Sequence, residues 1–290
     1  MGAGHRIIDA HTHLFAPEIV RDRSSYLARD AWFGDLYASP GTILVTPEDL
    51  IESMDAAAIE MSIVCGWPWT DMGLCREHND FLAEVQQRYP DRIAWLAIVN
   101  PASPEAPAEI ERALKLGARG IGELNADAQG FNWERHGELA GAMDACLELD
   151  VPVLMHCSEP VGHAYPGKGT ATPEKILNFL EANLDLRVVA AHWGGGLPFY
   201  ELMPEVALIT ANVTYDSAAS TYLYGFNVFP VVERLIGEQR AMFGTDFPLL
   251  KQRVFLERVL RSGMPEESLP GLLGETAARV FKIGHEVATR

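Results

Sequence analysis

Short apolar segments alternate with longer segments of helical periodicity along almost the whole chain. Eight of the apolar segments have the length of β-strands and end at polar or turn-forming residues. We expect strands at residues 6–10, 61–65, 93–99, 119–124, 151–156, 187–192, 211–216 and 241–246. Single strands that alternate with helices are typical of βα units around a parallel sheet.

Three of the expected helices share one start signal. Thr46, Ser103 and Thr172 are each followed by Pro and then Glu. A hydroxyl group can cap free backbone N–H groups, Pro fits the first helical position, and an acid is favourable near the positive end of the helix dipole. A further helix is expected within 133–149, where one apolar face is formed by Leu139, Ala142, Met143, Cys146 and Leu147.

Eight strands that alternate with helices over 290 residues predict an α/β fold, a closed (β/α)8 TIM barrel in one domain covering residues 1–290. An open doubly wound sheet is the main alternative, but no Gly-rich dinucleotide fingerprint follows the first strand. The longest interruption is an aromatic-rich insertion at 14–46, after strand 1. We expect it to be a structureless loop, either a lid over the site or a segment packed on the barrel rim.

Composition and charge narrow the classes of partner. The formal net charge of −17 argues against nucleic acids and anionic membranes, whose phosphates favour Lys and Arg. The four cysteines form no CxxC pair, and the N-terminus lacks the apolar region of a signal peptide. No apolar run approaches the roughly 18 residues of a membrane span. We therefore expect a cytoplasmic protein with reduced thiols and a small-molecule substrate.

The stretch "DAHTHLF" places Asp9, His11 and His13 two residues apart at the end of the first strand. Residues two apart in a strand point to the same side, so we expect all three at the mouth of the barrel. Two imidazoles at this spacing can reach one cation.

Other strands end in metal-competent side chains as well. Glu123 ends strand 4, His156 strand 5, His192 strand 6 and Asp246 strand 8. Because barrels carry their active sites at the carboxyl ends of the strands, these residues predict one metal centre.

With these motifs, the sequence resembles the amidohydrolase superfamily of metal-dependent TIM-barrel enzymes. It is most similar to the amidohydrolase-related (amidohydrolase 2) branch, which holds hydrolases, lactonases and non-oxidative decarboxylases. The resemblance runs from "DAHTH" through "AHWGG" and "FGTDFP" to "GETAARVFKI". It indicates the superfamily but no particular substrate.

The resemblance implies that His11, His13 and Asp246 bind a metal and that His156 joins them. His192 is implied either as an acid/base group beside one metal or as a ligand of a second. Glu123 stands where a bridge between two metals belongs, or else hydrogen-bonds and orients an imidazole. We interpret Asp9 as a buried hydrogen-bond acceptor.

The chemistry that follows needs a divalent metal, one or two ions. Zinc suits these ligands best, with manganese or iron as alternatives. The metal lowers the pKa of a bound water. Asp246 is then our choice of base, and His192 would stabilise the developing oxyanion if it binds no metal.

Loop residues are the candidates for substrate binding. Trp67 follows strand 2, whereas His163, Tyr165 and Lys168 lie in the Gly/Pro-rich loop 158–169. Lys168 either neutralises a substrate carboxylate or phosphate or is an ordinary solvated lysine. The histidines outside the strand ends, His78, His136 and His285, are interpreted as surface or helix residues.

Three functions are weighed. Hydrolysis of a C–N or C–O bond in an amide, cyclic amide or lactone comes first. Decarboxylation of an aromatic or unsaturated acid is the alternative, but it should place an arginine near the metal, and Arg119 lies too early in strand 4. A non-catalytic binding protein on the same fold should have lost a ligand, yet every expected position is filled. Paired barrels are common in the family, which leaves a homo-oligomer open.

Overall fold

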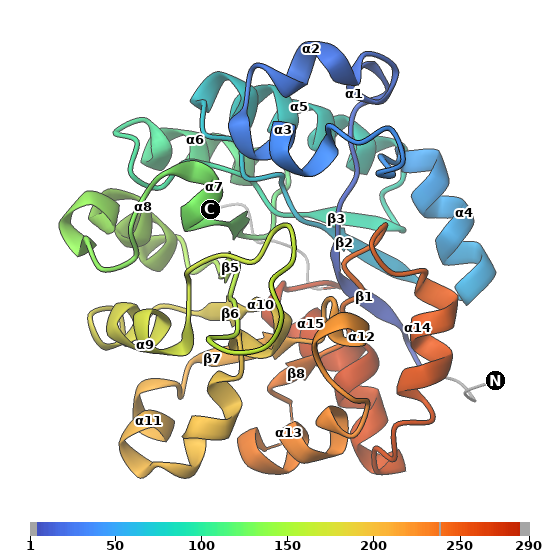
Figure 1. Ribbon diagram of the computed structural model, residues 1–290, viewed down its shortest axis with the longest axis vertical. Helices are drawn as coiled ribbons and strands as arrows, with labels where there is room; N and C mark the ends of the chain where they lie inside the picture. The colour runs from blue at the N-terminus through green and yellow to red at the C-terminus, as the bar shows by residue number, and fades with distance from the viewer. Residues whose placement is uncertain (1–4, 238, 285–290) are drawn as a thin grey trace.

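The eight strands form a parallel barrel at the centre of the molecule (Figure 1). The computed structural model describes residues 5–237 and 239–284. Strands pair in chain order within two sheets, β1-β2-β3 and β4-β5-β6-β7-β8, and every pair is parallel. The strands are β1 (Ile8–Thr12), β2 (Met61–Val64), β3 (Ile93–Trp95), β4 (Ile121–Leu124), β5 (Val153–Met155), β6 (Val188–Ala190), β7 (Val213–Asp216) and β8 (Ala241–Met242).

Two seams join the sheets into a closed barrel. Ala97 bridges Ile121 between β3 and β4, and Thr12 bridges Phe247 between β1 and the segment after β8. Backbone hydrogen bonds continue the second seam, with Ala10 donating to the Phe243 carbonyl. The predicted barrel, with all eight strands, is therefore confirmed, although each strand is shorter than or offset from its predicted range.

Helices surround the strands (Figure 1). None of the described helices combines the length and the apolarity needed to cross a bilayer. The helices are α1 (Pro17–Arg21), α2 (Arg23–Leu27), α3 (Ala31–Tyr37), α4 (Pro47–Ala57), α5 (Met72–Arg88), α6 (Ala106–Lys115), α7 (Ala126–Gln129), α8 (His136–Glu148), α9 (Pro173–Glu181), α10 (Ala191–Gly194), η1 (Leu197–Leu202), α11 (Pro204–Ile209), α12 (Ser220–Leu223), α13 (Val228–Ile236), α14 (Gln252–Val259), η2 (Glu266–Ser268), η3 (Gly271–Glu275) and α15 (Thr276–Val280).

Two of the three predicted helix starts are confirmed. Helices α4 and α9 follow Thr46 and Thr172 directly and begin with Pro. The start at Ser103 is wrong, because the hydroxyl of Ser103 accepts the N–H of Glu105 in a turn and α6 begins only at Ala106. Helix α8 buries its predicted face except for Leu147, which is 49 % exposed near the end of the helix.

The insertion at 14–46 is not a structureless loop, which corrects the prediction. It forms α1, α2 and α3, and its aromatic rings pack on one another and on the barrel rim. The ring centroids of Phe33 and Tyr37 lie 4.8 Å apart, and Tyr37 lies 5.1 Å from Trp67 of the β2 loop. Aromatic packing of this kind gives a short helical segment enough buried area to stay ordered.

The barrel interior below the site is apolar. Its side chains form one cluster with the end of the chain, and Phe281 is 1 % exposed there. The cluster includes Ile8, Met61, Leu154, Val189, Met242, Val280, Phe281 and Ile283. Ile8 and Met61 begin their strands, so the segment around α15 closes the amino-terminal end of the barrel.

Candidate metal centre and active site

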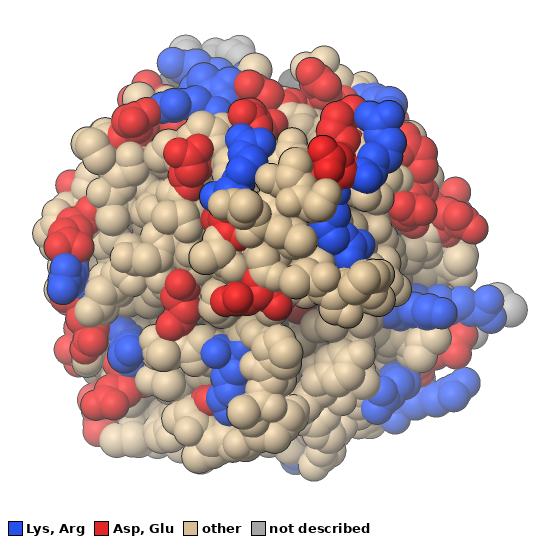
Figure 2. All heavy atoms as spheres, turned by 45° about the horizontal axis from the view of Figure 1, so that its top comes forward, with Lys and Arg blue, Asp and Glu red and all other residues tan. Residues whose placement is uncertain are grey.

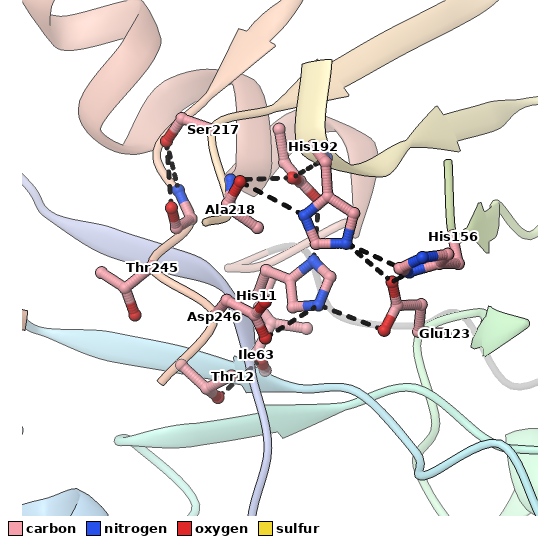
Figure 3. A network of polar contacts seen from close by, with 12 residues as sticks. His11, Thr12, Ile63, Glu123, His156, His192, Ser217, Ala218, Thr245 and Asp246 are labelled. Atoms are coloured by element: carbon pink, nitrogen blue, oxygen red, sulfur yellow. Dashed lines mark hydrogen bonds and ion pairs between the residues drawn. The ribbon is translucent and has the colours of Figure 1, made fainter. Parts of the chain in front are cut away.

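Six metal-competent side chains meet at the carboxyl ends of the strands in two groups. His11, His13 and Asp246 form the first group, and Glu123, His156 and His192 form the second. Figure 3 shows the side chains of His11, Asp246, Glu123, His156 and His192 turned toward a common centre. These are the residues that the sequence predicts for a metal.

The first group, together with one oxygen of Glu123, has the dimensions of a coordination sphere. His11 Nε2 lies 3.1 Å from His13 Nε2 and 3.5 Å from Glu123 Oε2. Asp246 Oδ1 lies 3.8 Å and 3.5 Å from these two imidazole nitrogens, and Glu123 Oε2 lies 3.4 Å from His13. A tetrahedral ion bound at about 2.1 Å holds its ligand atoms roughly 3.4 Å apart, so these four atoms fit a divalent cation.

The hydrogen-bond partner of His11 explains why a cation is needed there. Asp216 Oδ2 lies 2.9 Å from His11 Nδ1, and the pKa of Asp216 is lowered because His11 more than offsets the effect of burial. A carboxylate accepts only, so His11 Nδ1 donates. Burial would lower the pKa of His11, but the acidic groups around it raise it well above its usual value, so the carboxylates of Glu123 and Asp246 require positive charge at His11 Nε2, from a proton or from a metal that takes its place. Asp216 thus orients a ligand as metal sites usually require.

Glu123 connects the two groups through its second oxygen. Glu123 Oε1 lies 2.8 Å from His156 Nδ1 and 3.2 Å from His192 Nε2, and the two imidazole nitrogens are 3.2 Å apart. The structure therefore places His156 with Glu123 and His192, and not with His11, His13 and Asp246 as the resemblance implied. One carboxylate between two donor groups has the arrangement of a bridging ligand, and it equally hydrogen-bonds both imidazoles.

The contacts between Glu123 and the imidazoles shift the pKa values of these buried groups. Burial would raise the pKa of Glu123, but the positive charges of His11 and His156 lower it well below its usual range. Burial alone would lower the pKa of His192, yet its hydrogen bond to Glu123 raises it to about 9. The carboxylates of this centre thus strongly favour positive charge beside them, supplied by protons or by a metal.

Backbone strain is concentrated at two of the six residues. His192 has a φ of 58° and begins a left-handed turn through Gly196, and Asp246 has a φ of 63°. Glycine is required in this turn because a Cβ at Gly195 would lie 2.4 Å from the carbonyl oxygen of Ser158. Left-handed non-glycine residues persist only where the surroundings impose them, and they are frequent at functional sites.

Asp9 does not share a face with the two histidines, which corrects the prediction. Its carboxylate accepts hydrogen bonds from Thr245 and from Gln252 of α14, whereas Ile8 and Ala10 face the barrel interior. A register irregularity between Asp9 and Thr12 changes which side of β1 faces inward. Asp9 is the buried acceptor that the sequence suggested, and burial raises its pKa to about 6.

A cavity of about 630 Å³ opens over five of the six side chains, all except the fully buried His11. Trp67, His163 and Tyr165 line it, as the sequence predicts, and aromatic rings from the insertion and from α12 contribute further walls. Among the described residues that line it, none is Lys or Arg. The aromatic lining residues are Trp32, Tyr37, Trp67, Tyr165 and Tyr222.

Lys168, a candidate for substrate binding, is not among the residues that line the cavity. Its ammonium group lies 3.2 Å from Glu159 Oε1 and donates to the carbonyls of Val161 and His163. Glu159 also accepts the Tyr165 hydroxyl. Lys168 therefore braces the loop behind the cavity wall, because its charge is already satisfied by Glu159.

The family assignment rests on the whole chain. A family model described as amidohydrolase (Amidohydro_2) matches residues 8–283. The chain belongs to this family. The resemblance carried by the motifs is thereby confirmed, and the amidohydrolase 2 fold explains why six donors gather at one end of the barrel.

Solved structures share the fold of this amidohydrolase 2 member at low sequence identity. 5-Carboxyvanillate decarboxylase from Novosphingobium aromaticivorans, complexed with manganese and 4-hydroxy-3-methoxy-5-nitrobenzoic acid, is 21 % identical, with a TM-score of 0.79 over 97 % of each chain. A 2,6-dihydroxybenzoate decarboxylase bound to 2,6-dihydroxybenzoate is 19 % identical, with a TM-score of 0.74 over 97 % of this chain and 100 % of that one. A putative amidohydrolase from Staphylococcus aureus is 18 % identical, with a TM-score of 0.71 over 96 % of this chain and 100 % of that one. A search among curated proteins finds no match.

Sequence reasoning missed two residues of this site. Asp216 ends the seventh strand, so the strand-end rule that found Glu123 could have found it. Asn125 lines the cavity from the loop after β4, where no motif marks it. Tyr37 of α3 also lines the cavity, from the insertion that the sequence offered as a possible lid. His78 lies buried in α5 and His136 begins α8, so both are helix residues as expected, and His285 lies outside the described residues.

Proposed function

We propose that this amidohydrolase 2 member is a metal-dependent, non-oxidative decarboxylase of a small aromatic acid. The observation that carries the proposal is the cavity, whose aromatic walls open directly on to the metal-competent side chains. A flat ring fits between such walls while its polar substituents face the ligand cluster. This order of candidates reverses the one drawn from the sequence, which placed hydrolysis first.

The solved structures of similar fold support this choice. The two decarboxylases described above are named for aromatic acids as substrates. A dihydroxybenzoic acid decarboxylase from Polaromonas sp. JS666, with manganese and the inhibitor 2-nitroresorcinol, is 19 % identical at a TM-score of 0.76 over 96 % of this chain and 97 % of that one. Manganese in two of these structures makes it at least as good a choice here as the expected zinc.

The arginine expected near the metal of a decarboxylase is not among the described lining residues, and neither is a lysine, so in this proposal the metal itself would bind the substrate's carboxylate. We infer that His11, His13, Glu123 and Asp246 hold the metal, which supplies the positive charge for substrate oxygens. The bond between ring carbon and carboxylate then breaks, CO₂ leaves, and the ring carbon takes a proton in its place. Asp246 and His192 are the acids placed to deliver that proton.

The test is decarboxylation in heavy water. Manganese-loaded and zinc-loaded protein would be incubated with hydroxylated benzoates, and CO₂ and ring deuterium measured together. One equivalent of CO₂ with one deuterium at the vacated carbon is the expected result. Loss of both signals in Asp246→Asn ties the reaction to this site, whereas no CO₂ from any acid with either metal contradicts the proposal.

Hydrolysis of a C–N or C–O bond is a second candidate, favoured by Glu123. Its two oxygens face separate donor groups, as in sites where two metals activate one water. Elemental analysis of metal per chain distinguishes the candidates. Two equivalents in the wild type would favour hydrolysis of amides, cyclic amides or lactones, and one equivalent would favour decarboxylation; Glu123→Gln should lower the metal content in either case, because Glu123 contacts both donor groups.

Four further predictions from the sequence stay predictions. They are the single domain over 1–290, the cytoplasmic location, the absence of nucleic-acid and membrane partners, and a homo-oligomer. On the face that Figure 2 brings forward, basic side chains are interspersed with acidic ones and with uncharged surface. That face carries no extended basic area of the kind that phosphate backbones bind.

A further inference from the structure

Asn125 presents an amide group of fixed orientation to the cavity. Its Oδ1 accepts the backbone N–H groups of Asp127 and Ala128, both at 3.1 Å, and thereby caps α7. Only the oxygen of the amide can accept two N–H groups, so the assignment of oxygen and nitrogen is settled by the contacts. The Nδ2 group must then point away from α7.

The Nδ2 group of Asn125 donates no hydrogen bond to the described part of the protein. Asn125 lines the cavity and is only 4 % exposed, and no acceptor for Nδ2 is found among residues 5–237 and 239–284. Nδ2 of Asn125 is not a fully buried atom, unlike the indole nitrogen of Trp67, which is fully buried and has no hydrogen-bond partner. A donor held rigidly at the wall of a cavity is free to hydrogen-bond to a molecule that occupies that cavity.

The position of Asn125 on the chain fixes where its partner lies. Glu123 and Asn125 are two residues apart in extended backbone, while Leu124 between them packs into the outer hydrophobic core. Both side chains line the cavity, and two residues of a strand tilted by about 36° put Asn125 roughly 5 Å farther toward the mouth. That separation is close to the width of one substituted benzene ring.

Resting on the proposed function, we propose that Asn125 is a specificity-determining residue that donates its amide N–H to a distal oxygen of the substrate. The substrate class is then an aromatic acid with two polar ends. One end carries the carboxylate at the metal, and the other carries an oxygen acceptor across the ring. Acids without the distal oxygen leave the Asn125 amide unpaired in a desolvated site, which weakens their binding.

The experiment is a double-mutant cycle between Asn125 and the distal oxygen. Calorimetry on manganese-loaded protein would compare salicylate with 4-methoxysalicylate and 5-methoxysalicylate, for wild type and Asn125→Asp. Asp caps a helix as well as Asn does but offers an acceptor where the amide donated. Methoxy oxygens only accept, so they cannot bind the new carboxylate by donating to it.

We expect wild type to prefer one methoxysalicylate over salicylate by roughly fivefold to tenfold, and Asn125→Asp to lose that preference. The added negative charge affects all three anions alike and cancels in the cycle. Asn178→Asp, on the exposed side of α9, is the matched control and should keep the preference. Asn125→Ser, which also caps, replaces Asn125→Asp if the latter fails to fold.

An unchanged preference in Asn125→Asp or Asn125→Ser overturns the inference and leaves decarboxylation standing. Failure of wild type to bind any of the three probes, or to prefer either methoxysalicylate, overturns it as well. Loss of the preference in the variant supports the inference even if no acid releases CO₂. In that case decarboxylation alone is contradicted, so the two failures are distinguishable.

Discussion

The two ends of the barrel bury side chains of opposite character, apolar at one end and charged or polar at the other. At the amino-terminal end, Phe281 and Ile283 pack with the first residues of the strands in an apolar cluster. At the carboxyl end, the carboxylates of Glu123 and Asp246 both lie within 4 Å of the imidazole nitrogen of His11. One end gains stability from burial, whereas the other needs positive charge among its carboxylates, from protons or from a metal.

The difference shows where substitutions should affect stability and where they should affect chemistry. Residues of the apolar end contribute free energy of folding and touch no substrate. Residues of the polar end repel one another without a cation and are retained for what they bind. Three predictions test this division, from the largest expected effect to the smallest, and a fourth concerns a histidine that belongs to neither end.

Asp246→Asn should reduce turnover of a decarboxylase substrate by about 10³-fold, or about 4 kcal/mol in activation free energy. The amide keeps the shape of the side chain but removes its charge and its ability to carry a proton. Steady-state kinetics and metal content per chain measure the loss. Asp144→Asn, on the exposed side of α8, is the control, and equal losses in both variants would contradict the role of Asp246.

Phe281→Ala should lower the free energy of unfolding by about 3 kcal/mol, because it leaves a cavity at the apolar end of the barrel. Urea denaturation followed by circular dichroism measures this. Metal content of the folded protein should match that of wild type. A large loss of metal without loss of stability would show that the two ends are not independent.

Asp216→Asn should weaken metal binding 10- to 100-fold, because His11 then loses the carboxylate that holds its Nδ1 proton. Competition with a chelator gives the affinity. Thermal unfolding of the metal-free protein should change little. An affinity equal to that of wild type would show that His11 is oriented by packing alone.

His78 makes stability depend on pH outside the metal centre. It packs among Phe15, Trp69 and Phe81, and burial lowers its pKa to about 3. In the unfolded chain His78 binds a proton below about pH 6.5, whereas in the folded chain it does so only near pH 3. The free energy of unfolding therefore falls as the pH drops from 6.5 toward 3. At pH 5.5 the loss is about 1.4 kcal/mol.

His78→Phe should remove that loss while preserving the aromatic packing. Urea denaturation of both proteins without metal, at pH 7.5 and pH 5.5, measures the contribution, because the two proteins differ only at this residue. If wild type and variant lose equal stability on acidification, His78 is protonated in the folded state and the prediction is wrong.

The sequence allowed the fold and most of the candidate ligands to be predicted, because both depend on strand periodicity. His156 and His192 end apolar strands, and the barrel brings such ends together whatever the loops do. Glu123 was found in the same way. Its contact with both donor groups depends on side-chain geometry that no spacing in the sequence reveals.

Features set by tertiary contacts were beyond prediction. The irregularity in β1 turns Asp9 away from His11, and nothing in "DAHTH" marks it. The insertion folds into helices because Tyr37 packs against Trp67 at the rim of the barrel, and these two residues are thirty positions apart in the sequence. Lys168 pairs with Glu159, which the folded loop places beside it.

The seam between β1 and the segment after β8 has a consequence for synthesis of the chain. His11 lies near the start of the sequence and Asp246 near its end, and Asp246 donates its backbone N–H to the carbonyl of His11 across this seam. A nascent chain emerging from a ribosome therefore lacks a complete cation site until most of its residues have been translated. Metal binding should consequently be one of the last events in the synthesis and folding of this protein, after the strands of the barrel have paired.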